Sequence, residues 1–231
     1  MTPSFALRDA LALGDLQTFL GRSARVDDGA VRLIGSGGVL AVYTSVLQPA
    51  GLLDRSPTVL GLRTFAAETQ APVDSVVPIR ALLDRLARLE GPATGSPGES
   101  VGVLVPPDTA TAPWAGISPP RAGWERVADA PVAVLRAAAR AGIDEVAAAV
   151  PSGIGEQIVA RVRGEVWGRP VEGAPDVLAG GAFAAFSLGF LGPDPAPDAA
   201  PDDEEPPAAV FRTGPWTRLT TARGHVLVRR L

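Results

Sequence analysis

The side chains most often used in covalent catalysis are scarce in this sequence. It contains no Cys and no Lys, and His225 is its one histidine. These absences exclude a thiolate nucleophile, a Schiff-base lysine and a zinc site built from cysteines or several histidines. A Ser-His-Asp triad would have to use His225, for which the sequence shows no partner. We therefore expect no cofactor and no metal site, and the inventory favours a protein that is not an enzyme.

Carboxylates are the main reactive class that remains, and they support an alternative hypothesis of a hydrolase or transferase. Its candidate residues are Asp54, Asp84, Asp144 and Glu156, but their spacing selects no pair. The segment 152–155, Ser-Gly-Ile-Gly, precedes an expected helix and is a weak candidate for anion binding on backbone amides. The acidic cluster 202–205 lies between prolines, which predicts a solvated charge run rather than a cation site.

Tryptophan and arginine form the group of residues that the sequence favours as a binding surface. All four Trp lie in the second part of the chain, after residue 100, and three have Arg close in sequence. Trp and Arg are enriched at binding hot spots, where a guanidinium also stacks on an aromatic ring. The alternative interpretation is that the Trp side chains pin loops onto the core. The predicted binding residues are Trp114, Arg121, Trp124, Trp167, Arg169, Trp216 and Arg218.

Charge is unevenly distributed near the C-terminus. Residues 193–207 carry six acids and no base, whereas residues 208–231 carry five Arg and no acid. The first segment is rich in Pro and acids, and it is predicted to be a disordered linker. The second gives a third hypothesis, weak nucleic-acid binding through a basic hairpin. Because six acids adjoin the five Arg, nucleic acid is not the expected partner.

The elements that would position these residues follow from apolar spacing and turn chemistry. In the first part of the chain we expect a helix over 5–20, strands over 30–34, 39–47 and 58–66, and a helix beginning at Pro78. In the second part we expect a strand over 101–105, helices over 131–141, 144–150 and 154–167, a helix from Asp176 to near Leu191, and a hairpin over 210–231. A helix ending Phe-Leu-Gly precedes each of two similar hairpins, at Arg32 and Arg218, which suggests an internal repeat.

The predicted fold class is α+β, with a small antiparallel sheet, flanking helices and a helix-rich second half closed by a C-terminal β-hairpin. The hairpin is a candidate to pair with the first sheet. The expected organisation is an α+β domain over 1–90, a linker over 91–100, a helix-rich domain over 101–192, the acidic linker over 193–207 and the hairpin over 208–231. No stretch of about 20 apolar residues occurs, and no signal peptide is recognisable, so a cytoplasmic protein without membrane contact is expected.

Three segments resemble signatures of an uncharacterised actinobacterial protein family. They are Pro113–Trp124, Val166–Pro170 and Gly214–Leu219. The lack of Lys and Asn fits a high-GC bacterial genome. The resemblance implies no activity and assigns no catalytic residue. The favoured function is a non-catalytic binding protein whose partner is another protein, including a second copy of this chain.

Overall fold

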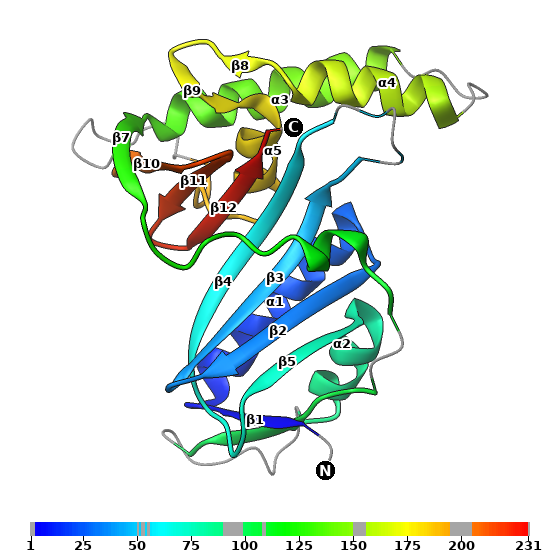
Figure 1. The fold of residues 1–231 in the computed structure, drawn as a ribbon, viewed down its shortest axis with the longest axis vertical. Helices are drawn as coiled ribbons and strands as arrows, with labels where there is room; N and C mark the ends of the chain where they lie inside the picture. Colours follow the sequence, from blue (N-terminus) through cyan, green and yellow to red (C-terminus); the bar gives the residue numbers. More distant parts are fainter. Residues whose placement is uncertain are drawn as a thin grey trace. The chain divides into compact units, whose positions relative to one another are not determined.

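The chain is a mixed α+β protein in a computed structural model (Figure 1). The structure describes residues 3–49, 51, 54, 56–89, 99–107, 110–149, 156–194 and 205–230. Within these residues it contains five α-helices and one short 3-10 helix. The chain divides into two compact units. Unit 1 comprises Met1–Ser45 and Leu62–Ser118, and unit 2 comprises Val46–Gly61 and Pro119–Leu231.

The β-structure is larger than expected. A ten-stranded antiparallel sheet has the order β5-β2-β3-β4-β12-β11-β10-β7, and β1 pairs with β4 and β6. The prediction of a small sheet is therefore wrong. In this order β12 lies beside β4. Residues 58–61 of β4 belong to unit 2.

Unit 1 is built mostly from antiparallel strands and two helices. Its elements are β1 (Ser4–Leu7), α1 (Ala10–Val26), β2 (Ala30–Ser36), β3 (Val39–Leu47), β4 (Thr58–Glu68), β5 (Val73–Pro78), α2 (Ile79–Ala87), β6 (Val101–Leu104) and the 3-10 helix η1 (Pro113–Gly116). Asp9 caps α1, since its Oδ1 accepts a hydrogen bond from the amide of Ala12 at 2.8 Å. Gly37 and Gly38 adopt positive φ values, as the tight β2–β3 turn requires.

Unit 2 places helices on one face of its strands. Its elements are β7 (Glu125–Ala130), α3 (Val132–Ala149), α4 (Glu156–Trp167), β8 (Pro170–Val171), β9 (Ala174–Leu178), α5 (Ala179–Ser187), β10 (Ala208–Thr213), β11 (Trp216–Thr221) and β12 (Gly224–Arg229). Gly181 of α5 leaves room for Val228 of β12, where an added Cβ would lie 3.1 Å from the valine. Helix α5 therefore packs on the face of β12 that carries Val226 and Val228, both of which are buried.

Several predicted elements differ from the structure. The first helix begins at Ala10 instead of residue 5, and this shift leaves Leu11 83% exposed. The two helices expected over 131–141 and 144–150 form the single helix α3. Asp176 lies within β9 and is not a helix N-cap. The last segment has three strands, β10–β11–β12, where one hairpin was expected.

Each unit contains a strand, a helix and then three consecutive antiparallel strands. In unit 1 and β4 the series is β1–α1–β2–β3–β4, and in unit 2 it is β9–α5–β10–β11–β12. The repeat inferred from Arg32 and Arg218 aligns β2 with β11, so it is shifted by one strand relative to this common series. The linkers predicted over 91–100 and 193–207 fall largely outside the described residues, and those boundaries stay predictions.

Candidate binding site

Three of the four Trp side chains lie in the interior. Trp114, Trp167 and Trp216 are only 4%, 2% and 4% exposed. Trp167, at the end of α4, stacks on Phe183 of α5 with ring centroids 4.5 Å apart. These three side chains pin chain segments onto the core, in agreement with the alternative interpretation of the Trp residues.

Trp124 is half-buried and takes part in a different arrangement. The guanidinium carbon of Arg218 lies 4.6 Å from the centroid of the Trp124 ring and 4.5 Å from that of Phe211. The indole of Trp124 is held by a hydrogen bond from its Nε1 to the carbonyl of Pro120 at 2.9 Å. We call Trp124, Arg218 and Phe211 the Arg218 sandwich. Two of the seven predicted binding residues, Trp124 and Arg218, thus come together. Phe211, which was not predicted, is the third member of the cluster.

Phe211 was missed because its partner is set by strand pairing. Phe211 of β10 lies directly opposite Arg218 of β11, and cross-strand partners share a face of the sheet. Across the other edge of β10, Phe211 is the partner of Arg126 in β7, beside a bulge. The two strands are separated by a turn, and the register follows from neither charge nor hydropathy alone. A correct prediction of three strands in this segment would have placed Phe211 beside Arg218.

The charge of Arg218 has no carboxylate partner among the described residues. Three other Arg side chains, in β7, in β10 and in the β11–β12 turn, do have one. Ion pairs join Arg126 to Asp129 at 2.6 Å, Arg212 to Asp176 at 2.6 Å and Arg223 to Glu205 at 3.2 Å. The buried Nε of Arg218 has no hydrogen-bond partner. Burial lowers the pKa of Arg218, since removal from water disfavours the charged form.

His225 lies opposite Thr220 of the adjacent strand β11. Its Nδ1 lies 3.0 Å from the hydroxyl oxygen of Thr220. Burial, followed by the positive charge of Arg218, holds the pKa of His225 below its ordinary value.

The remaining predicted binding residues, Arg121 and Arg169, are exposed. Arg169 pairs with Glu145 of α3 at 2.9 Å, a surface ion pair of low energetic value. Arg121 lies in the loop before Trp124. The binding roles of both residues stay predictions.

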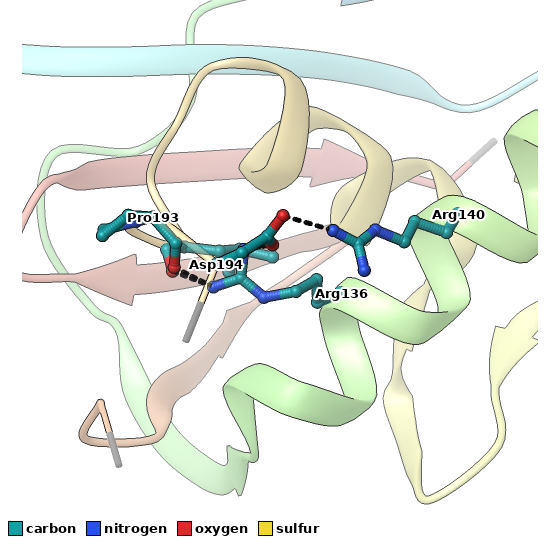
Figure 2. A network of polar contacts seen from close by, with 5 residues as sticks. Arg136, Arg140, Pro193 and Asp194 are labelled. Atoms are coloured by element: carbon teal, nitrogen blue, oxygen red, sulfur yellow. Dashed lines mark hydrogen bonds and ion pairs between the residues drawn. The ribbon is translucent and has the colours of Figure 1, made fainter. Parts of the chain in front are cut away.

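Arg136 of α3 forms the most buried polar network of unit 2 (Figure 2). Its side chain donates to the carbonyls of Leu191 and Pro193 at 2.7 and 2.9 Å and to the carboxylate of Asp194 at 2.8 Å. Arg140, one helical turn further on, donates to the other carboxylate oxygen at 2.6 Å. Every contact fixes the chain segment that follows α5, so we assign this cluster a structural role.

Arg32 forms a second network, in unit 1. Its guanidinium makes a bidentate contact with Asp74 of β5, with both N–O distances 2.8 Å. Its remaining donor reaches the carbonyl of Ala115 and the hydroxyl of Ser118. The segment containing η1 is thereby held to β2, and the adjacent Trp114 is buried.

Helix α1 presents an open ridge that ends in two Arg side chains. Leu11, Asp15, Thr18, Arg22 and Arg25 follow one another at intervals of three or four residues, which places them on one side of the helix. Asp15 is paired with Arg63 at 2.8 Å. Gly14 and Gly21 adjoin this ridge, and a Cβ added at either would meet no atom within 4 Å. The C-terminal half of the ridge therefore carries two Arg side chains, with open space at the adjoining Gly21.

The carboxylates of the enzyme hypothesis do not converge. Asp54 accepts a hydrogen bond from the amide of Ser56 within its own loop, and Asp84 and Asp144 are exposed on α2 and α3. The side chain of Glu156 and the segment 152–155 lie outside the described residues. Among the residues that the structure describes, no group of three or more acidic, His or Cys side chains is arranged to hold a metal ion.

Unit 1 contains a depression among the residues that the structure describes there. It has a volume of about 450 Å³ and lies at strands β1 and β6 and the end of β4. Glu68 is the one acid among its lining residues, so it does not supply a carboxylate pair. As for membranes, none of the helices within the described ranges has the length and apolar character needed for a span.

Solved structures show what the fold is similar to. The Caulobacter crescentus beta sliding clamp with PEG bound to a putative beta-motif tethering region is 10% identical, with a TM-score of 0.50; the match covers 100% of this chain and 65% of that chain. A DNA polymerase sliding clamp from Bacillus subtilis is also 10% identical over 100% of this chain and 65% of its own, with a TM-score of 0.46. The chain thus spans about two thirds of the length of these clamps. The likeness shows a sliding-clamp-like fold.

This fold corrects two predictions. The hypothesis of a generic, unspecified binding role for a Trp/Arg-rich surface is wrong, because the whole chain has a sliding-clamp-like fold. The expectation that nucleic acid is not a partner is wrong for the same reason.

The family comparisons support the expected resemblance to an uncharacterised family. No curated protein matches the chain. Residues 1–107 match the domain of unknown function DUF8010, and residues 119–231 match the domain of unknown function DUF8185. The first match ends at residue 107, and the second begins at residue 119, directly after the last residue of unit 1. Each part of the chain therefore matches an uncharacterised domain, which supports the expected resemblance to an uncharacterised family.

Proposed function

We propose that this protein is a clamp-type scaffold that binds duplex DNA without reading its sequence. The observation that carries the proposal is the likeness of the whole chain to the beta sliding clamp of Caulobacter crescentus at a TM-score of 0.50. The scarcity of catalytic groups and the scattered carboxylates are compatible with a role that involves no covalent chemistry. DNA recognition of this kind depends on phosphate contacts, which carry no sequence information.

The open ridge of α1 is the surface of unit 1 best suited to a phosphate backbone. Arg22 and Arg25 lie one turn apart, and Gly14 and Gly21 allow another chain to approach the helix closely. The negative charge of Asp15 is already matched by Arg63. We place the first phosphate contacts at Arg22 and Arg25.

The test is the salt dependence of DNA affinity. A labelled 30-base-pair duplex is titrated with the protein at several salt concentrations between 50 and 200 mM, conditions under which phosphate contacts dominate binding, and anisotropy is followed. Each lost phosphate contact reduces the slope of log K against log salt by about 0.9. The double variant Arg22→Gln/Arg25→Gln should therefore lower the slope by about 2.

The matched control removes two Arg from another helix. Arg161→Gln/Arg163→Gln on α4 lowers the net charge by the same amount and should leave the slope unchanged. If both double variants reduce the slope equally, the phosphate contacts do not lie specifically at Arg22 and Arg25. If the protein shows no measurable affinity for duplex DNA even at 50 mM salt, the proposed function is overturned.

The proposed function also implies where the protein acts in the cell. A scaffold for bacterial DNA works in the cytoplasm, which is where we place the protein. We also retain an actinobacterial origin for the family, supported by the Arg-only basic composition of the chain.

A further inference from the structure

The Arg218 sandwich is a built feature that the proposed function does not use. It lies in unit 2, whereas the proposed DNA contacts lie on α1 in unit 1. Its two aromatic rings come from different segments, and Trp124 is fixed by its own hydrogen bond to Pro120. The sandwich is thus held in place before any ligand arrives.

The geometry restricts how a ligand can reach the guanidinium. The centroids of the Trp124 and Phe211 rings lie 4.6 and 4.5 Å from the guanidinium carbon, so both rings contact the guanidinium as cation–π partners. A further ligand must use the N–H groups at the edge of the guanidinium. A carboxylate matches that edge with two parallel hydrogen bonds.

The charges around the sandwich indicate a single anionic group. Arg126, Arg212 and Arg223 each have a carboxylate partner within the described residues, so these three guanidiniums are compensated whereas Arg218 is not. A DNA backbone gains affinity from several phosphate contacts at once. A partly desolvated single cation with apolar surface beside it is better matched by one acidic side chain of a protein segment.

We propose that the Arg218 sandwich binds one carboxylate side chain of an extended acidic protein segment, with Trp124 and Phe211 contacting the neighbouring apolar atoms. The partner supplies the counter-charge that the described part of this chain does not. The inference goes beyond the proposed function and does not depend on DNA binding.

The test uses two labelled octapeptides, acetylated and amidated so that neither carries terminal charge. One has Asp-Leu at its centre and Gly and Ser elsewhere, and the other has Asn-Leu in the same place. Fluorescence anisotropy should show that the Asp peptide binds the wild-type protein at least about 10-fold more tightly than the Asn peptide, because charge-assisted hydrogen bonds are lost. Arg218→Gln should weaken the Asp peptide by about the same factor.

Two further variants separate recognition from general charge and from folding. Arg218→Lys keeps the charge but removes the two-pronged edge, so it should also weaken the Asp peptide, while its melting temperature reports on folding. Arg229→Gln, on β12, lowers the net charge equally and should leave affinity unchanged. In the wild-type protein, the Asp peptide should shift the indole N–H resonance of Trp124.

Three results would overturn the inference. The first is no binding of the Asp peptide up to about 1 mM, the weak limit of specific recognition. The second is equal weakening by Arg218→Gln and Arg229→Gln. The third is a 20-base-pair duplex whose affinity depends on Arg218 and which displaces the peptide, because the site would then be a nucleic-acid contact. Loss of the α1 salt effect with peptide binding intact would count against the proposed function alone.

Discussion

Replacing Gly142 by alanine tests how closely α3 and α4 pack. A Cβ at this position would lie 2.7 Å from Cη2 of Trp167 and closer still to Cζ3. Carbon atoms normally approach to about 3.5–4.0 Å, so the indole or the helix must move. Trp167 has little freedom to do so, since it is 2% exposed and stacked on Phe183.

The expected cost combines opposing effects. Alanine favours a helix over glycine by about 1 kcal/mol. Overpacking a core costs about 1–3 kcal/mol or more, and a disturbed aromatic stack adds about 0.5–1.5 kcal/mol. We expect Gly142→Ala to lower the free energy of unfolding by about 2 kcal/mol, measured by urea denaturation followed by circular dichroism.

Two glycines of α1 provide matched controls. A Cβ at Gly14 or Gly21 would meet no atom within 4 Å, so alanine there should raise stability by about 0.5–1 kcal/mol. Adding Trp167→Phe to Gly142→Ala removes the outer ring atoms, so the double variant should be no less stable than Trp167→Phe alone. If Gly142→Ala matches Gly14→Ala, the close contact between α3 and Trp167 is refuted.

Three further predictions concern the polar side chains. Arg136→Gln should lower the free energy of unfolding by about 2–3 kcal/mol, because a buried side chain loses its contacts with Asp194 and two carbonyls; urea denaturation measures this, with Arg161→Gln as a neutral surface control. The pKa of His225 is lowered by folding, so its contribution to stability is present above its ordinary value near 6.5 and is lost as the pH falls from there toward the folded-state pKa. NMR titration should show that pKa rising in Arg218→Gln, and an unchanged value would contradict the stated effect of Arg218. Arg32→Ala should increase hydrogen exchange of the amides in residues 113–118, and unchanged protection there would show that other contacts hold the segment.

Local signals predicted the β2–β3 hairpin well. The strand over 39–47 has the predicted bounds, because alternation of apolar residues and a glycine turn act within a few residues. In β5 the buried Ser75 interrupts the apolar alternation that would have marked a strand. Gly142 resembled a helix end, yet α3 continues through it. The glycine is needed there for packing, because any side chain at this position would collide with the ring of Trp167.

The sequence predicted only part of the candidate site. Trp124 and Arg218 stand out by residue type, but their contact joins residues far apart in the sequence. Phe211 became a partner through strand register, and Asp176 met Arg212 across the fold instead of starting a helix. Such pairings depend on tertiary structure, which neither composition nor spacing encodes locally.

The unequal burial of the indoles gives the protein an optical reporter of its own. Trp114, Trp167 and Trp216 are shielded from solvent, whereas Trp124 is half-exposed and in contact with a cation. A soluble quencher such as acrylamide should therefore act mainly on Trp124. Emission from the unlabelled protein can follow occupancy at this position without any added dye.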